Sequence, residues 1–415
     1  MNPALPRQHF VPDSEARVMP DGRLYIYGSY DLSGNNSYCS DVLHVFSTDN
    51  MIDWTDHGVS FSVRDIPWAK EGSILYAPDC IHNGGKYYLY FCLSDNTEGV
   101  AVSSRPYGPF ENPVQIEYAS GDGIDPAVFN DDDKRIYYFW GQFSLRACEM
   151  NSDMKTLKPE TIQKGLIDEK RFFFHEGASI RKYKNIYILL YTSIERGKAT
   201  CLAHATSLHP LGPYTYRGIV IDNIGCDPDT WNNHGSIECF KGRWYVFYHR
   251  SSQNSNFNRR LSIEPIEIDE SGFIKEVVPT SQGAEGPIST KLPIPASIAC
   301  RLGGWGTNAF IAPDPMINNS EVIFNASGSG WAIYRYVRFS HLETNIMIEY
   351  QSDGCGDFEL WADNQRICVL PFTETFSKYK TISAPITPVL GDHTLYLEWK
   401  IASGCAQIKR IQFSS

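Results

Sequence analysis

The stretch Gly84-Gly-Lys-Tyr-Tyr-Leu-Tyr-Phe91 joins a glycine turn with a lysine to a short run rich in tyrosine. Runs of aromatic and aliphatic residues that follow turn residues are typical of β-strands. The same pattern occurs four more times, at Asp21-Gly-Arg-Leu-Tyr-Ile-Tyr-Gly-Ser29, Asp133-Lys-Arg-Ile-Tyr-Tyr-Phe-Trp140, Tyr183-Lys-Asn-Ile-Tyr-Ile-Leu-Leu-Tyr191 and Lys241-Gly-Arg-Trp-Tyr-Val-Phe-Tyr248. The chain therefore contains an internal repeat of a turn followed by a tyrosine-rich strand.

The spacing of the repeat predicts the fold. Its central tyrosines are separated by 63, 49, 50 and 58 residues and are Tyr25, Tyr88, Tyr137, Tyr187 and Tyr245. A period of about 50 residues, with about four short strands in each unit, is typical of a β-propeller, whose blades repeat around one axis. Five copies predict five blades. The alternative is a series of β-sandwiches with coincidental spacing.

The last third of the chain has a different composition and strand pattern. Residues 279–297 contain Pro279-Thr-Ser-Gln-Gly-Ala-Glu-Gly-Pro287 and Lys291-Leu-Pro-Ile-Pro295, which are typical of a linker. Short alternating strands follow, such as Trp331–Phe339 and His393–Trp399, and they suit a β-sandwich. We therefore predict an all-β chain: a five-bladed β-propeller over residues 1–290 and a β-sandwich domain over residues 298–415.

Charge and composition exclude several classes of partner. The formal net charge of -11 argues against a nucleic-acid partner, which needs a basic surface. No run approaches the ~18 consecutive apolar residues of a membrane span, and the first ten residues lack the apolar core of a signal peptide. The 11 cysteines form no CxxC pair, which favours buried free thiols over a zinc cluster. These features predict a cytoplasmic protein with neither a nucleic acid nor a membrane as its partner.

One ionisable side chain lies 9 to 12 residues before the central tyrosine of each repeat. These side chains are Asp13, Asp79, Asp125, Glu176 and His234. In a propeller the innermost strands of all blades line a central channel, so we expect the five groups to converge at one end of it. Four acids and one histidine would then share a single site.

Such a cluster suits hydrolysis of a glycoside. Like charges in a confined site raise one another's pKa, which keeps one carboxyl group protonated as a general acid. In glycoside hydrolysis one carboxyl group protonates the leaving oxygen while another activates water on the opposite face of the sugar. Tyr76, Phe174 and Trp140 are expected to stack on that sugar. The alternatives are a metal-binding propeller and a set of purely structural turns.

Over about residues 8–290 these motifs resemble glycoside hydrolase family 43, whose members are five-bladed propellers that cleave arabinofuranosides and xylosides with inversion. The resemblance implies that Asp13 is the general base. It implies that Asp125, in Ile-Asp-Pro, orients the acid and keeps it protonated, and that Glu176, before Gly177, is the general acid. Ser14 stands where the family commonly has proline after the base.

The same resemblance implies a set of binding residues. His234, in a His-Gly-Ser motif, is expected to line the channel and to help hold a structural calcium ion through water. Arg259 is expected to reach the sugar hydroxyls. Tyr76 stands where the family usually has tryptophan in Trp-Ala-Pro-Asp, and Asp79 of that motif is expected to support the channel. Phe174 completes the predicted substrate contacts, and no cofactor is implied for the chemistry.

The C-terminal residues, about 300–415, resemble carbohydrate-binding module family 6, mainly through Gly391-Asp-His-Thr-Leu-Tyr-Leu-Glu-Trp399. Trp331, Tyr334 and Trp361 are candidates to stack on a sugar. Core packing explains each of these aromatic residues equally well, and the domain could instead shape or buttress the propeller's active site.

Taken together, the resemblance implies an inverting, exo-acting hydrolase of xylan- or arabinan-derived oligosaccharides, which are its expected partners. We expect release of terminal L-arabinofuranose first, with β-xylosidase activity in the same pocket. The alternatives are a non-catalytic sugar-binding propeller, a hydrolase of another glycoside such as a galactoside, and a sugar phosphorylase or transferase. Nothing in the sequence indicates the oligomeric state.

Overall fold

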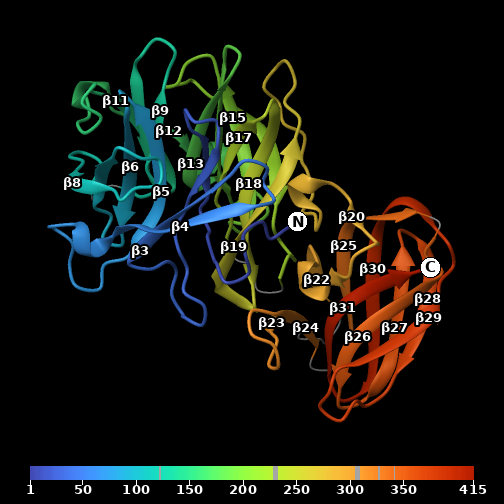
Figure 1. Cartoon of the computed structure of the whole chain (residues 1–415). Helices are drawn as coiled ribbons and strands as arrows, with labels where there is room; N and C mark the ends of the chain where they lie inside the picture. The colour runs from blue at the N-terminus through green and yellow to red at the C-terminus, as the bar shows by residue number, and fades with distance from the viewer. Residues whose placement is uncertain (121–122, 228–231, 304–308, 326–327, 341) are drawn as a thin grey trace.

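The computed structural model describes residues 1–120, 123–227, 232–303, 309–325, 328–340 and 342–415. Strands dominate, and they form five small antiparallel sheets and two larger ones (Figure 1). Within the described residues the α-helix α1 (Glu169–Phe172) is one turn long, and the 3-10 turns are η1 (Val63–Asp65), η2 (Pro159–Thr161), η3 (Gly283–Glu285) and η4 (Ala296–Ile298). No helix in these ranges has the length and apolar character needed to cross a membrane.

The five small sheets follow one another along the chain. The first contains β1 (Glu15–Val18), β2 (Leu24–Tyr27), β3 (Val42–Thr48) and β4 (Trp54–Ser62). The second contains β5 (Leu75–Asn83), β6 (Lys86–Leu93), β7 (Glu98–Ser103) and β8 (Glu111–Gln115). The third contains β9 (Ala127–Asn130), β10 (Ile136–Trp140), β11 (Ser144–Met150) and β12 (Gln163–Asp168). The fourth contains β13 (Phe174–Tyr183), β14 (Ile186–Ser193), β15 (Cys201–Ser207) and β16 (Thr215–Asp222), and the fifth contains β17 (Ser236–Phe240), β18 (Arg243–Ser252) and β19 (Ser255–Ile266).

These sheets are the blades of a propeller. Their first strands contact one another in the cyclic order β1, β5, β9, β13, β17 and back to β1. Five separate apolar cores fill the spaces between neighbouring blades, including the space between the fifth blade and the first. The ring is therefore closed, and the prediction of five blades is confirmed.

Each tyrosine-rich run forms the second strand of its blade, as the repeat predicted. Tyr25 and Tyr137 are both 2% exposed and pack in the cores between blades, which explains why the repeat is rich in aromatic residues. Gly84 and Gly85 connect β5 to β6 with φ angles of 55° and 78°. A type I′ hairpin turn needs positive φ at both central positions, and glycine adopts such angles without a steric penalty.

The N-terminal segment closes the ring without forming a regular strand. The backbone N–H of Ala4 donates to the carbonyl of Leu261 in β19, and the Asn2 side chain bonds to Ile263 and Glu264. Since the fifth blade has three strands within the described residues, this segment covers the edge that a fourth strand would occupy.

Two sheets packed around one large apolar core form the C-terminal domain. One sheet has the order β20 (Ile288–Ser289), β25 (Ser329–Ser340), β30 (Leu390–Ser403), β27 (Cys355–Ala362) and β28 (Gln365–Phe372), with β22 (Arg301–Gly303) beside β25. The other has the order β23 (Phe310–Pro313), β24 (Glu321–Asn325), β31 (Ala406–Ser414), β26 (Asn345–Ser352) and β29 (Lys380–Pro385), with β21 (Ile294–Pro295) beside β31. This is the predicted β-sandwich.

Two details of this domain differ from the predictions. The segment read as a linker contains β20 and β21, which already pair with β25 and β31 of the sandwich. Strands of two residues show no alternation, so the sequence pattern did not reveal them. Tyr334 is fully buried and its hydroxyl donates to the carbonyl of Ala296, so it is not available to stack on a sugar. Trp331 and Trp361 are partly exposed, and sugar binding by this domain stays a prediction.

An ion-pair cluster closes the channel on one side of the predicted site. Arg17 of β1 bonds to both carboxylate oxygens of Asp79 in β5, at 3.0 and 2.7 Å. Arg181 of β13 bonds to Glu15 of β1 at 2.6 Å and to Glu238 of β17 at 3.0 Å. These residues lie further along the innermost strands than the predicted catalytic residues, so the cluster forms a floor across the channel.

Candidate active site

A cavity of about 330 Å³ lies at the end of the channel that the floor leaves open. Side chains from all five blades line it, and they are Asp13, Tyr38, Cys39, Tyr76, Ile124, Asp125, Gln142, His175, Glu176, Asn232, His234 and Arg259. The structure thus brings together six of the predicted site residues: Asp13, Tyr76, Asp125, Glu176, His234 and Arg259.

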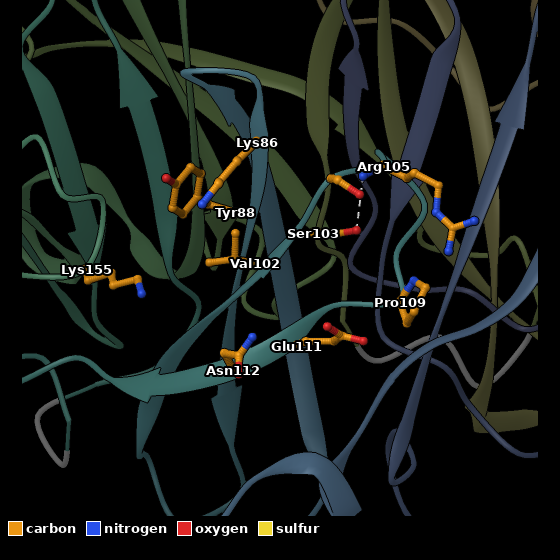
Figure 2. Close-up of a pocket in the computed structure, with 10 residues that line it drawn as sticks. Lys86, Tyr88, Val102, Ser103, Arg105, Pro109, Glu111, Asn112 and Lys155 are labelled. Atoms are coloured by element: carbon orange, nitrogen blue, oxygen red, sulfur yellow. Dashed lines mark hydrogen bonds between the residues drawn. The ribbon is translucent and has the colours of Figure 1, made fainter.

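A second cavity, of about 390 Å³, lies on the second blade between β6, β7 and β8 (Figure 2). Its charged lining residues are Lys86, Arg105, Lys155 and a single carboxylate, Glu111. Glycoside hydrolysis uses a pair of carboxyl groups, so this surface groove lacks the required chemistry. The channel cavity is therefore the candidate active site.

Two aromatic residues that were predicted to contact the sugar, Phe174 and Trp140, do not line the cavity. Phe174 is fully buried, with its ring 5.6 Å from that of Tyr191 in the core between the third and fourth blades. Trp140 is 1% exposed and belongs to the core between the second and third blades. The prediction that these rings stack on sugar is wrong. A bulge separates Phe174 from Glu176 in β13, Trp140 lies in the second strand of its blade, and both rings pack in the cores between blades.

Asp79 was also placed in the substrate-binding set, and this prediction is wrong for a related reason. A bulge separates Tyr76 from Asp79 in β5, so Tyr76 lines the cavity while Asp79 lies further along the channel. Asp79 is 1% exposed, pairs with Arg17 and accepts a hydrogen bond from the backbone N–H of Val128. Its expected role as a support of the channel matches this position.

Both aspartates of the cavity sit in a sparsely populated backbone conformation. Asp13 precedes β1 with φ 54°, and Asp125 precedes β9 with φ 63°. Aspartate tolerates the left-handed region better than most residues, and strain of this kind is concentrated at functional sites. The same turn in two blades aims both carboxyl groups into the cavity.

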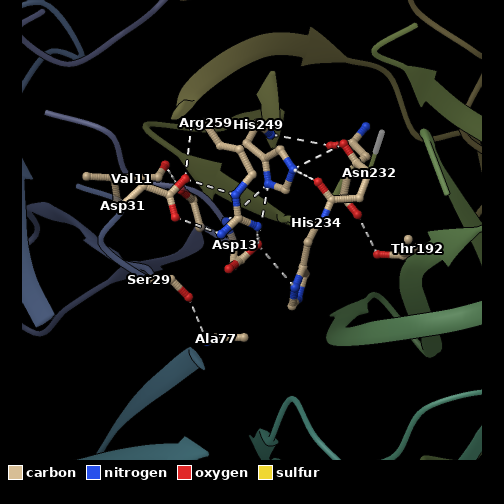
Figure 3. A network of polar contacts seen from close by, with 12 residues as sticks. Val11, Asp13, Ser29, Asp31, Ala77, Thr192, Asn232, His234, His249 and Arg259 are labelled. Carbon is tan, nitrogen blue, oxygen red and sulfur yellow. Dashed lines mark hydrogen bonds and ion pairs between the residues drawn. The ribbon is translucent and has the colours of Figure 1, made fainter. Parts of the chain in front are cut away.

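Asp13 is surrounded by cationic and imidazole groups (Figure 3). Arg259 donates from Nη1 to its Oδ1 at 3.0 Å, and the Nδ1 atoms of His249 and His234 lie 3.4 and 3.7 Å from the same oxygen. Burial alone would raise the pKa of Asp13, but the charge of Arg259 outweighs burial and holds that pKa well below its usual range. Asp13 is therefore ionised at neutral pH.

Arg259 is itself fixed by Asp31, a residue that the sequence analysis missed. Asp31 is 1% exposed and accepts hydrogen bonds from Nε, Nη2 and the backbone N–H of Arg259, at 2.9, 2.9 and 3.0 Å. The Tyr38 ring covers the guanidinium at 4.6 Å. Arg259 is therefore pre-organised between two carboxylates (Figure 3). Asp31 follows β2 without any motif, so the sequence held no signal for it.

His249 is a second residue that the sequence analysis missed. Its Nδ1 accepts a hydrogen bond from the backbone N–H of Asp13 at 3.3 Å, and its Nε2 lies 3.1 Å from the carbonyl of Asn232. The ring is fully buried, and burial lowers its pKa. His249 is therefore a neutral imidazole that holds the turn carrying Asp13.

Asp125 and Glu176 are the two other carboxyl groups that line the cavity. Asp125 is 6% exposed, and burial followed by the charges of Glu176 and Asp13 raises its pKa well above the ordinary value. The backbone N–H of Gly177, the residue after Glu176, hydrogen-bonds to Asp125. The nearby charge of Glu176 and burial therefore favour the protonated form of Asp125.

Gln142 is a third residue without a sequence signal. It follows β10, and its Nε2 donates to Oε2 of Glu176 at 2.8 Å. That oxygen is thereby occupied as an acceptor. A proton carried by Glu176 is therefore directed to its other oxygen, Oε1.

His234 packs between the two carboxyl groups. Its Nδ1 lies 3.7 Å from Asp13 and 4.0 Å from Asp125. A side chain at Gly177, which has φ 67°, would place its Cβ 2.7 Å from the His234 ring. The glycine after the predicted acid is therefore required for the histidine to reach the cavity.

Comparison with known proteins identifies the family of the chain. The sequence model of glycosyl hydrolases family 43 matches residues 7–274. A xylosidase/arabinosidase of Thermoclostridium stercorarium is 30% identical over 98% of this chain and 97% of its own length. A beta-xylosidase of Xylanibacter ruminicola is 30% identical over 65% of this chain and 97% of its own length.

Solved structures agree with the sequence relatives. A family 43 beta-xylosidase/alpha-arabinofuranosidase from a compost metagenome, in complex with xylotriose and in a calcium-free form, is 30% identical with a TM-score of 0.58. It covers 67% of this chain and 97% of its own. A family 43 arabinoxylan arabinofuranohydrolase from Bacillus subtilis, 22% identical with a TM-score of 0.58, covers 100% of this chain and 97% of its own and shares the fold. The family match does not extend to the sandwich. The chain is therefore a glycoside hydrolase and belongs to glycosyl hydrolases family 43.

Proposed function

We propose that the chain is an inverting, exo-acting hydrolase that releases terminal L-arabinofuranose or D-xylose from xylan-derived oligosaccharides. The observation that carries the proposal is the contrast between the carboxyl groups of one cavity. Asp13 is held ionised beside Arg259, whereas burial and the neighbouring carboxyl charges raise the pKa of Asp125 well above its ordinary value. Surroundings that give neighbouring carboxyl groups different pKa values allow one group to act as an acid while another acts as a base.

In this mechanism Asp13 takes a proton from water, and that water attacks the anomeric carbon. Glu176, the member of the carboxyl pair that is less buried, donates its proton to the glycosidic oxygen. Asp125 accepts a hydrogen bond from the backbone N–H of Gly177 and so helps to hold Glu176 in place. Arg259 and Tyr76 line the cavity and are placed to contact the hydroxyl groups and face of the sugar.

Two features support action on a chain end. The cavity volume of about 330 Å³ lies at the small end of the ~300–1,000 Å³ range of ligand pockets. The ion-pair cluster of Arg17 and Arg181 blocks passage of a chain along the channel. A closed pocket that admits a terminal sugar is consistent with the activities in the relatives' names, xylosidase/arabinosidase and beta-xylosidase.

A phosphorylase is less well supported. Such an enzyme needs a free cationic group to hold phosphate in place of water. Among the lining residues that the structure describes, Arg259 supplies the guanidinium group, which Asp13 and Asp31 already neutralise, and the other basic side chains are the imidazoles of His175 and His234.

The sequence analysis predicted a calcium ion near His234, held through water. Calcium prefers six to eight oxygen ligands. His234 offers nitrogen, and Arg259 already neutralises Asp13. No group of three or more potential metal ligands occurs within the described residues. The side chains around His234 do not fit a directly coordinated calcium ion, and no step of the proposed mechanism depends on one.

The test is paired initial rates on an aryl α-L-arabinofuranoside and an aryl β-D-xyloside, with the anomeric configuration of the released sugar followed by NMR. We expect turnover of at least one substrate, with a first-formed product of inverted configuration. The ratio of the two rates shows which of the two glycosides is the preferred substrate. Retained configuration would overturn the inverting mechanism, and inactivity on both would overturn the substrate class.

Gln142→Leu tests the placement of the acidic proton. Loss of one hydrogen bond to Glu176 frees its carboxyl group to rotate, and we expect kcat on xylobiose to fall roughly tenfold. An aryl glycoside with a good leaving group needs little protonation, so its rate is expected to change much less. The exposed Gln163→Leu in β12 is the matched control. Equal losses on both substrates would contradict the assignment.

A further inference from the structure

A buried ion pair joins the C-terminal domain to the propeller. Arg260 of β19 donates from Nη1 and Nη2 to the two carboxylate oxygens of Glu321, the first residue of β24, at 3.0 and 2.7 Å. The side chains are 3% and 5% exposed. A two-point bond between a guanidinium and a carboxylate fixes orientation as well as distance.

The same arginine holds the segment that leads to Asp13. Arg260 Nη2 also donates to the carbonyl of Arg7 at 2.7 Å, and its guanidinium carbon lies 4.4 Å from the Phe10 ring centre. The carbonyl of Phe10 in turn accepts from the backbone N–H of Asp31 at 2.9 Å. Arg260 therefore packs against residues shortly before the proposed base, and Phe10 connects it to Asp31.

The neighbour of Arg260 in β19 is Arg259, which reaches the active site. Successive side chains of a strand point to opposite faces. One face of β19 thus presents Arg260 to Glu321, and the other presents Arg259 to Asp13 and Asp31. A shift of the strand at the domain boundary is transmitted directly to the guanidinium beside Asp13.

Glu321 also restrains the hairpin that begins β19. Gln253, in the turn between β18 and β19, donates from Nε2 to Glu321 Oε1 at 3.0 Å. Asn258 of β19 donates to Gln253 Oε1 at 3.0 Å. The carboxylate of Glu321 therefore contacts both the strand and its turn.

We propose that Glu321 of the C-terminal domain is a positioning residue for hydrolysis, acting through Arg260 to fix Arg259 and Asp13. The inference rests on the proposed function of Asp13 as the base. A displacement of about 1 Å at a catalytic group can cost as much as ~100-fold in rate, so support of this kind has a measurable effect. The C-terminal domain is thus part of the catalytic apparatus and not only an appended module.

The proposal predicts a change in pH dependence. The charged and titratable groups that face Asp13 are Arg259, His234, His249, Asp125, Cys39 and Tyr38. Of these, Arg259 opposes burial most strongly and keeps the pKa of Asp13 low. A carboxylate with a lowered pKa supports activity above that pKa and loses it as the pH falls. Loosening Arg259 raises the pKa, so the acid limb of the activity profile moves to higher pH.

The experiment compares Glu321→Gln with wild type in the full chain. We expect kcat/KM to fall roughly 3- to 30-fold, in keeping with couplings measured between distant residues. We also expect the acid limb of the kcat/KM profile to shift to higher pH. Rates are measured well below the melting temperature of each protein. If wild type hydrolyses no pentoside, the proposed function fails first, and that outcome is separate from failure of this inference.

Glu343→Gln is the matched control. Glu343 is a buried carboxylate of the same domain, 6% exposed and bonded to Ser340 and Thr290, and within the described residues it makes no hydrogen bond or ion pair with Arg260. We expect it to lower the melting temperature while leaving the acid limb in place. Superposition of the Glu321→Gln and wild-type profiles would overturn the proposal, as would an equal shift in Glu343→Gln.

A double variant covers the case in which Glu321→Gln fails to fold because Arg260 is left unpaired. Arg260→Met combined with Glu321→Met removes both charges, a replacement that proteins often tolerate. It also removes the bonds to Arg7 and Gln253. We expect the same shift of the acid limb, and a wild-type profile in this variant would overturn the inference.

Discussion

Replacing Glu176 with glutamine is expected to lower kcat on xylobiose by about 10²- to 10⁴-fold, the usual contribution of a positioned general acid. Glutamine retains the size of the side chain and an oxygen to accept from Gln142, but it has no proton to donate. A dinitrophenyl glycoside needs little protonation of its leaving group, so we expect its rate to fall by less than about tenfold. Initial rates on the two substrates provide the measurement.

The exposed Glu270→Gln serves as the control, because its carboxylate lies on the surface beside Lys184 and does not line the cavity. We expect wild-type rates on both substrates. If Glu176→Gln lost the same factor on both, Glu176 would act in some way other than as the proton donor.

Replacing Asp13 with asparagine is expected to lower kcat by about 10²- to 10⁴-fold on every substrate, whatever its leaving group. The attacking water must lose a proton in each case, and asparagine does not accept it. Azide attacks without losing a proton, so we expect added azide to restore turnover of an aryl glycoside. The product is a glycosyl azide of inverted configuration, identified by NMR.

Asp49→Asn, at an exposed carboxylate paired with Arg23, is the control for Asp13. Thermal unfolding is recorded in parallel, because the asparagine variant leaves Arg259 with less compensation for its charge. Wild-type activity in Asp13→Asn would assign the base to another group. A glycosyl azide of retained configuration would contradict attack from the face opposite the leaving group.

The architecture was accessible from sequence because its signals are local and repeated. The turn and tyrosine-rich strand recur in every blade, and each copy occupies the second strand of its sheet. A short apolar strand bounded by turn residues can be recognised without knowledge of its partners. β20 and β21 escaped recognition because two residues carry no periodicity and owe their strand geometry to pairing with β25 and β31.

The candidate site was accessible in part. Asp13, Asp125, Glu176 and His234 were identified because they share one phase of the repeat, and the structure places all four around one cavity. Asp79 has the same phase but lies beyond a bulge, which a repeat alignment does not register. The residues that tune the site arise from contacts distant in sequence.

The sequence by itself determined the number of blades, the sandwich that follows them and the presence of an ionisable side chain in or just before each innermost strand, since these depend on local patterns and their spacing. Only the tertiary structure decided what each carboxyl group does. Asp13 is ionised because Arg259, 246 residues away in the chain, donates to it, and Arg259 is held by Asp31 from 228 residues away. Charge, burial and hydrogen bonding act through space, so these roles exist only once the ring of blades has closed and the second domain has docked against β19.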